Sequence, residues 1–85
     1  MAEAGEMRVS ELLNKSVITN KGNDLGVVTE VELAWKDCYL KGLLVEPSKD
    51  MARRYGANMI EVPWSAVMAV GKYVVVDEDK VRPRR

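Results

Sequence analysis

Few side chains in this sequence have the chemistry of a catalytic site. Cys38 is the one cysteine and there is no histidine, so an internal disulfide, a histidine-activated thiolate and the usual zinc ligand sets are all missing. Asp37 precedes Cys38, and a neighbouring carboxylate disfavours the thiolate. We therefore interpret Cys38 as structural or incidental. The sequence predicts no catalytic residue, no cofactor and no metal site.

Two groups of acids could bind a cation or act as a carboxylate pair. Glu30 and Glu32 are two residues apart, which places them on one face of a strand. Asp77, Glu78 and Asp79 are consecutive, whereas a calcium loop spaces its oxygen ligands around a glycine turn. Alternating acids are typical of the solvent face of a half-buried strand. We interpret the first group as such a face and the second as part of a polar tail.

Basic residues suggest a second hypothesis, which is that the protein contacts RNA. Arg53 and Arg54 could bind phosphates, Tyr55 could stack on a base, and the chain ends in Arg82-Pro83-Arg84-Arg85. Thirteen basic and thirteen acidic residues cancel, however, so no overall field attracts nucleic acid. The charge balance therefore does not favour nucleic acid as the partner.

The first half of the chain has the pattern of short strands separated by turns. A turn of helix at residues 10–13 precedes a strand at residues 16–19, and the turn residues 20–24 follow. Residues 25–35 and 39–46 are strand-like and separated by a short turn, which predicts an antiparallel hairpin. The alternation breaks near Val28 to Glu30, which predicts a β-bulge there.

The hairpin is followed by a short helix and then by more strand. Residues 43–45 are apolar without alternation, which predicts a strand covered on both faces, by the core and by further chain or a second copy. Residues 48–56 begin with a serine cap, carry bases in the last turn and end on glycine, the signature of a short helix. Apolar and polar residues alternate again at residues 59–62, with Ile60 and Val62 facing inward. Pro63 ends the ladder of backbone hydrogen bonds, because it has no N–H to donate.

The last part of the chain is expected to form a helical turn and the final strand of the sheet, followed by a tail outside the sheet. Residues 64–70 are predicted as a helical turn with Val67 and Val70 inward and Met68 outward. Gly71 allows the reversal into a strand at residues 73–76. Residues 77–85 are predicted as a polar tail.

These elements predict one all-β domain. Five or six short strands form a small, strongly bent antiparallel sheet that closes into a β-barrel, with one or two short helical turns. No apolar run approaches the roughly 18 residues of a membrane-spanning helix, and the first residues lack a signal-peptide pattern. We expect a cytoplasmic protein that meets a membrane only through a partner.

More large apolar side chains are present than a core of this size can bury. The surplus suggests self-association and binding of a protein partner, because tryptophan, tyrosine and methionine are enriched at interfaces. Trp64 is expected to cap the barrel internally. The candidate interface residues are Trp35, Leu43, Met59, Met68 and Tyr73.

The order and spacing of several motifs resemble those of the PRC-barrel domain. The motifs are Leu13-Asn14-Lys15-Ser16-Val17, Gly22, Leu25 to Val31, Gly42-Leu43-Leu44-Val45, Ile60 to Val67, Val70-Gly71 and Val74-Val75-Val76. The similarity covers roughly residues 7–77, which we take as the domain, with polar tails at residues 1–6 and 78–85. Asn14 departs from the pattern, because the family usually has glycine there.

The resemblance implies a small β-barrel without catalytic residues that acts as a docking surface. It is strongest to the stand-alone archaeal members, some of which are cell-division adaptors that dimerise and bridge a membrane-anchoring protein. The function this suggests is a non-enzymatic, homodimeric PRC-barrel adaptor in archaeal cell division. The alternative is an accessory protein of RNA processing or ribosome assembly that contacts rRNA or a ribosomal protein through Arg53, Arg54 and Tyr55.

Overall fold

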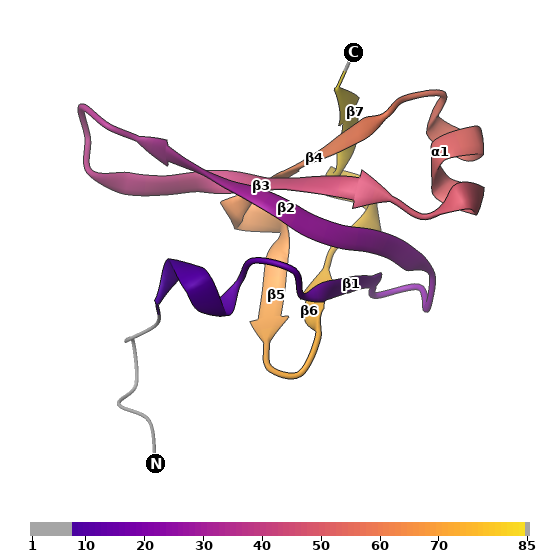
Figure 1. Cartoon of the computed structure of the whole chain (residues 1–85), viewed down its shortest axis with the longest axis horizontal. Helices are drawn as coiled ribbons and strands as arrows, with labels where there is room; N and C mark the ends of the chain where they lie inside the picture. The colour runs from indigo at the N-terminus through magenta and orange to yellow at the C-terminus, as the bar shows by residue number, and fades with distance from the viewer. Residues whose placement is uncertain (1–7, 85) are drawn as a thin grey trace.

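Residues 8–84 of the computed structural model form one seven-stranded sheet, one α-helix and three 3-10 turns (Figure 1). The predicted tail 1–6, the domain start at residue 7 and Arg85 lie outside the described residues. The elements in chain order are η1 (Val9–Glu11), β1 (Ser16–Thr19), β2 (Asp24–Ala34), β3 (Tyr39–Pro47), α1 (Lys49–Tyr55), β4 (Met59–Pro63), η2 (Trp64–Ala66), β5 (Val67–Val70), β6 (Val74–Val76), η3 (Glu78–Lys80) and β7 (Arg82–Arg84).

The sheet is mixed rather than purely antiparallel. Its strand order is β5-β6-β1-β2-β3-β4-β7, and β6 runs parallel to β1, with Val17 opposite Val74 and Thr19 opposite Val76. The prediction of an all-antiparallel sheet was wrong at this pair, because residues from the two ends of the sequence meet there. In the pairing of residues 8–84, β5 and β7 are the two edges, so this pairing shows no closure into a barrel.

The β2–β3 hairpin is confirmed, with Val31 opposite Leu43 and Ala34 opposite Tyr39. The predicted bulge lies between Val28 and Glu30, where the register shifts and the Thr29 hydroxyl donates to the Leu44 carbonyl at 3.2 Å. An extra residue at this point bends the strand, which helps the sheet to wrap around the core.

The strand at residues 43–45 is covered on both faces, as predicted, and this chain alone covers it. Leu43 and Val45 have no exposed surface and Leu44 is 5% exposed. A second copy is therefore not needed to bury this strand.

The predicted helix is α1, and its ends are set by Ser48 and Gly56. The Ser48 hydroxyl accepts from the Met51 amide at 3.3 Å and donates to the Asp24 carbonyl at 2.8 Å, which caps the helix and ties it to β2. Gly56 ends the helix in the left-handed conformation, with φ 64°. Asn14 has φ 68°, so it supplies the left-handed turn for which the family usually has glycine.

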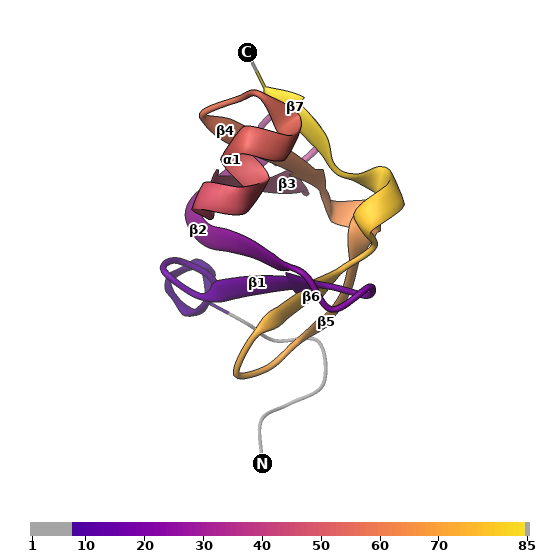
Figure 2. The same cartoon turned by 90° about the vertical axis from the view of Figure 1, so that its right-hand side faces the viewer.

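The bent sheet encloses a single core. Figure 2 shows β3, β4 and β7 on one side and β1, β5 and β6 on the other, with β2 between them. Ile60 and Val62 point inward without exposed surface, as predicted. The buried core residues come from every part of the chain: Leu12, Val17, Leu25, Val28, Leu43, Val45, Met51, Ile60, Val62, Ala66, Val74, Val76 and Val81.

Two predictions for the last third of the chain were wrong. The helical turn ends at Ala66, and Val67–Val70 is a strand that still packs Val67 and Val70 against the core and exposes Met68. The polar tail is instead η3 followed by β7, which pairs with β4 through Ile60 and Pro83. Val81 and Glu78 are both buried in this segment, so it is part of the folded domain.

Candidate functional site

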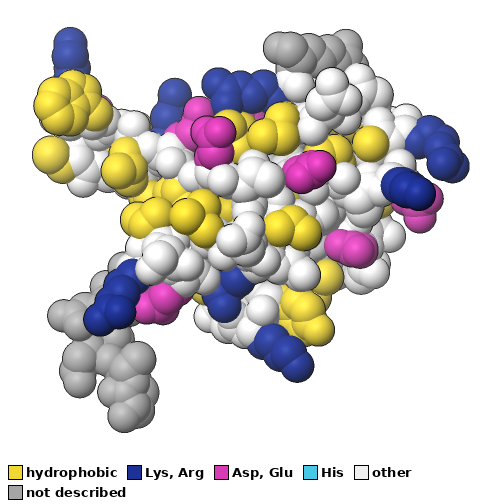
Figure 3. Space-filling view, in the orientation of Figure 1, with side chains coloured by type: hydrophobic (Ala, Val, Ile, Leu, Met, Phe, Trp, Pro, Cys, Tyr) yellow, Lys and Arg dark blue, Asp and Glu magenta, His cyan; other side chains and the backbone are white. Residues whose placement is uncertain are grey.

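The β2–β3 hairpin projects beyond the core and ends in exposed apolar side chains. We call residues 33–40 the hairpin tip. Leu33 is 61% exposed, Trp35 86% and Tyr39 56%. In Figure 3 hydrophobic side chains gather over this projecting end of the hairpin. Exposed aromatic and aliphatic side chains in one place are typical of a protein interaction site.

The register explains why the hairpin tip is apolar on both faces. Val31 packs against the core, and Leu33 lies two residues further along the same strand, on the same face. Leu33 therefore continues the core-facing row beyond the end of the core. Tyr39 is paired with Ala34 and lies on the opposite face, while Trp35 stands in the turn between the strands.

The turn that joins the two strands is tight. The Asp37 amide donates to the Ala34 carbonyl at 3.2 Å, and Cys38 adopts a left-handed conformation with φ 56°. The Cys38 thiol is exposed and lies 3.8 Å from the Trp35 carbonyl. Cys38 thus lies in the hairpin tip with its thiol exposed.

A second group of exposed apolar residues lies on the β5–β6 hairpin. Met68 is 60% exposed and Tyr73 is 45% exposed. This hairpin and the β2–β3 hairpin project from different parts of the domain in Figure 1. The predicted interface residues therefore divide between two separate surfaces.

The other two interface candidates lie elsewhere. Leu43 has no exposed surface and packs in the core, so it offers nothing to a partner. Its place in an apolar run did not distinguish a strand buried by its own chain from one covered by a second copy. Met59 is partly exposed on β4 and lines a shallow basin with Ala52, Gly56 and Arg84.

The residues proposed to contact RNA differ in their exposure. Arg53 and Arg54 are both exposed, and the Arg54 guanidinium lies 3.7 Å from the Glu78 carboxylate. Tyr55 is partly buried and packs against the core. The tyrosine is therefore less accessible for base stacking than the two arginines are for phosphate contact.

Glu30 and Glu32, the candidate carboxylate pair, do not act together in the structure. Glu30 is exposed, and Glu32 accepts from Arg84 at 3.0 Å. Arg84 also lies 3.7 Å from Glu61 on the same outer face. Among residues 8–84, no three His, Cys, Asp or Glu side chains converge as a metal site would require.

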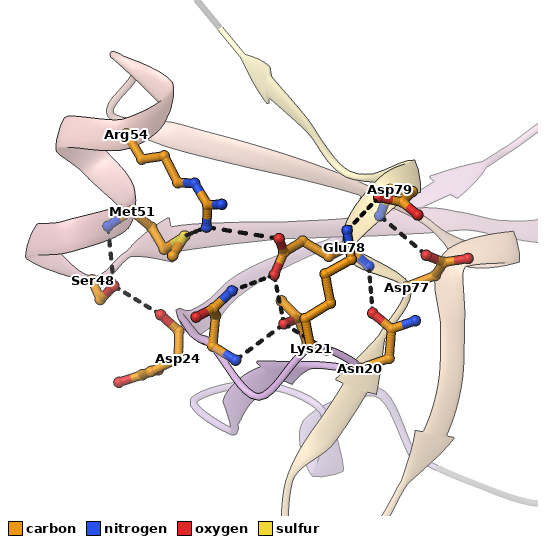
Figure 4. Close-up of polar contacts among 11 residues, drawn as sticks. Asn20, Lys21, Asp24, Ser48, Met51, Arg54, Asp77, Glu78 and Asp79 are labelled. Atoms are coloured by element: carbon orange, nitrogen blue, oxygen red, sulfur yellow. Dashed lines mark hydrogen bonds and ion pairs between the residues drawn. The ribbon is translucent and has the colours of Figure 1, made fainter.

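A buried polar cluster around Glu78 was missed by the sequence analysis (Figure 4). The Glu78 carboxylate accepts from the Thr19 hydroxyl at 2.7 Å and from the Asn23 amide at 2.6 Å. The Glu78 backbone amide donates to the Asn20 side chain at 3.1 Å. These contacts fasten η3 onto the β1–β2 turn, and we call residues 19, 20, 23 and 78 the Glu78 clasp.

The charge of Glu78 is stabilised by its neighbours. The hydrogen bonds from Asn23 and Thr19 hold the pKa of the Glu78 carboxyl below its ordinary value, against the effect of burial, and Arg54 acts in the same direction. Nearby, Lys21 and Asp79 form an exposed ion pair at 2.9 Å, which raises the pKa of Lys21. The acid at position 78 and the turn chemistry at 20–24 were both visible in the sequence, but nothing local indicated that they meet.

The part of the chain from residue 8 to 84 contains no helix long and apolar enough to cross a lipid bilayer.

Two comparisons with known proteins identify the family of this chain. The model of the PRC-barrel domain matches residues 4–82. An uncharacterised protein from the archaeon Methanocaldococcus jannaschii is 33% identical over 75 residues, which cover 86% of this chain and 83% of that protein. The matched residues include every strand of the sheet except the last two residues of β7. This chain belongs to the PRC-barrel domain family.

Proposed function

We propose that this domain is a non-enzymatic protein-binding module, a homodimeric adaptor that engages a protein partner through its hairpin tip. The observation that carries the proposal is the exposure of Leu33, Trp35 and Tyr39 on a hairpin that extends past the core. PRC-barrel domains are generally not catalytic, and the described residues hold no cluster of groups suited to acid–base or metal chemistry.

The hairpin tip has the properties expected of an interface centre. A tryptophan that is 86% exposed gains a large apolar contact area when a partner covers it. The leucine and the tyrosine beside it lie on opposite faces of the hairpin, so a groove in a partner can enclose the tip from both sides. Lys36 and Asp37 give the turn a polar rim.

Protein is a better partner than RNA for this chain. The net charge is zero, so the electrostatic attraction that supplies most non-specific affinity for nucleic acid is absent. Arg54 is already paired with Glu78, and Tyr55 packs against the core. These contacts reduce what Arg54 and Tyr55 can offer to an RNA.

The proposed process is archaeal cell division, in the cytoplasm. This step rests on the resemblance to stand-alone archaeal PRC-barrel proteins that act as division adaptors, and the archaeal relative supports an archaeal setting. In such a role the domain reaches a membrane only through the protein that it binds.

Replacing Trp35 tests the use of the hairpin tip. Trp35→Ser should leave the thermal stability nearly unchanged, because exposed substitutions usually alter the free energy of unfolding by less than about 0.5 kcal/mol. The same change should remove the bound partner, since interface tryptophans often contribute more than about 2 kcal/mol of binding free energy. The measurement is quantitative mass spectrometry of proteins cross-linked to the tagged chain in its native cell.

The matched control is Val27→Ser, which truncates an exposed apolar side chain on β2 outside the hairpin tip. It should retain the partner. If Trp35→Ser and wild type recover the same proteins in the same amounts, the hairpin tip is not the docking surface.

A further inference from the structure

The segment from Glu78 to Arg84 is attached to the domain mainly by charged and polar side chains. It comprises η3 and β7, which run in yellow along one side of the domain in Figure 2. Within residues 8–84, each of the four ion pairs has one partner in this segment. The hydrogen bonds between side chains that are distant in the sequence also all end on it. The rest of the described chain is held together by strand pairing and by the apolar core.

These contacts hold the segment at both ends. At the η3 end, the Glu78 clasp binds the β1–β2 turn, and Arg54 of α1 lies 3.7 Å from the same carboxylate (Figure 4). At the β7 end, the Arg84 guanidinium lies 3.0 Å from Glu32 and 3.7 Å from Glu61. Apart from Glu78, the paired side chains are all at least partly exposed. Ion pairs of this kind are individually weak and are screened by salt.

Apolar contacts contribute less to the attachment. Val81 is the one residue of the segment that belongs to the buried core, and the partly exposed Pro83 lies opposite Ile60. The pairing of β7 with β4 extends over three residues, and Pro83 has no N–H to donate to it. A segment with few buried apolar contacts can open while the remaining core keeps the domain folded.

We propose that residues 78–84, which we call the strap, open as one unit while the rest of the domain stays folded, and that this opening uncovers the outer edge of β4. In the closed state, Pro83 and the arginines on either side of it shield that edge, because proline and basic residues hinder pairing with another strand. Arg84 is also one wall of the basin beside Met59, so the opening widens the basin. This opening is independent of whether the hairpin tip binds a partner.

Native-state hydrogen exchange of the full chain, followed by NMR at low concentrations of urea, tests the opening. The amides of Lys80 and Arg82 should exchange with the same free energy of opening, and that free energy should hardly change with urea, because the strap exposes little surface when it opens. The amide of Val45, on the central strand β3, should exchange only through global unfolding and show the full dependence on urea.

Two variants test whether the ends of the strap open together. Arg84→Gln removes the contacts of β7 with Glu32 and Glu61 and should lower the protection of the Lys80 amide at least about threefold, although this amide is bonded within the η3 turn. Asn20→Ala removes one hydrogen bond of the clasp at the η3 end and should lower the protection of the β7 amides by a similar factor.

Salt provides a second test of the attachment. In NaCl at about 1 M the Debye length is only about 3 Å, so the protection of the Lys80 and Arg82 amides should fall at least about threefold, while the Val45 amide stays protected. Lys72→Gln is the control variant. It removes an exposed charge in the turn between β5 and β6 and should leave the exchange of the strap unchanged.

Three results would overturn the proposal. Strap amides with the same free energy of opening and urea dependence as Val45 would show that the strap opens only when the whole domain unfolds. Strap amides that exchange as fast as those of an unfolded peptide would show that the closed strap is not populated. An effect of Arg84→Gln confined to the amides of β7 would show that η3 and β7 open separately.

Discussion

Gly26→Ala is expected to remove a large part of the stability of the domain. Gly26 lies within the sheet, opposite Val17 on β1 and Pro47 on β3, with φ 146°, a conformation that L residues rarely adopt. A Cβ at this position would overlap the Glu46 carbonyl oxygen and lie 2.9 Å from the Pro47 Cα. All of these contacts are with backbone, so they cannot be relieved by a change of rotamer.

The expected cost is a substantial fraction of the stability of the whole domain. Backbone strain of about 1 to 2 kcal/mol adds to about 1 to 3 kcal/mol for overpacking. At roughly 0.05 to 0.15 kcal/mol per residue, a chain of this size has about 4 to 13 kcal/mol in total. Urea unfolding followed by circular dichroism measures the loss, and the dispersion of the amide NMR spectrum shows whether a folded state remains.

Gly71→Ala is the matched control. No atom lies within 4 Å of a Cβ built at Gly71, and its backbone is not in the left-handed region. The control should change the free energy of unfolding by less than about 0.5 kcal/mol. A Gly26→Ala variant as stable as Gly71→Ala would show that β2 and β3 do not approach as closely as the structure places them.

The parts of the fold that could be predicted are those encoded by neighbouring residues. The β2–β3 hairpin follows from two strand-like segments around a short turn, and the break in alternation near Thr29 located the bulge. Helix α1 follows from its serine cap and its closing glycine. In each case the residues that decide the structure are close together in the sequence, so pattern and turn chemistry suffice.

The parts that could not be predicted depend on residues far apart in the sequence. The parallel pairing of Val17 with Val74 joins both ends of the chain, and no local feature of either strand specifies it. The segment after Asp77 looked like a tail because it is rich in charge. Its acid Glu78 is buried only because Thr19 and Asn23 supply hydrogen bonds across the fold.

The candidate interface was predictable only where its residues are exposed for local reasons. Trp35, Met68 and Tyr73 are exposed because each lies in or next to a turn or on an edge, positions that the local pattern reveals. Leu43 lies in the middle of β3, where only the complete core shows that its own chain covers it.

Glu78→Ala should lower the free energy of unfolding at pH 7 by about 2 to 3 kcal/mol, because it leaves buried polar groups without a partner. Thr19 is 3% exposed and would lose the acceptor of its hydroxyl. The half-exposed Arg54 side chain can be solvated after the substitution, so the loss of its ion pair contributes less to the change in the free energy of unfolding. Urea unfolding measures the loss. Hydrogen exchange should show β7 amides opening first, since the Glu78 clasp holds η3 between β6 and β7.

The contribution of Glu78 should also depend on pH in a defined direction. Its pKa is lower in the folded chain than in the unfolded one, so the stabilisation is complete above the ordinary value near 4.5. It is lost as the pH falls through the folded-state pKa, because protonation then favours the unfolded chain. Unfolding curves from pH 7 to pH 3 should show the difference between wild type and Glu78→Gln shrinking below about pH 4.5, since glutamine does not titrate.

Asp79→Asn serves as the control for this experiment. It removes the ion pair with Lys21, in which both side chains are more than half exposed, so stability should remain near that of wild type and the pH profile should keep its shape. If Glu78→Gln instead follows wild type in parallel down to pH 3, the carboxylate of Glu78 is not held in its charged form by Asn23 and Thr19. The attachment of η3 would then rest on the burial of Val81 and the pairing of β7 with β4.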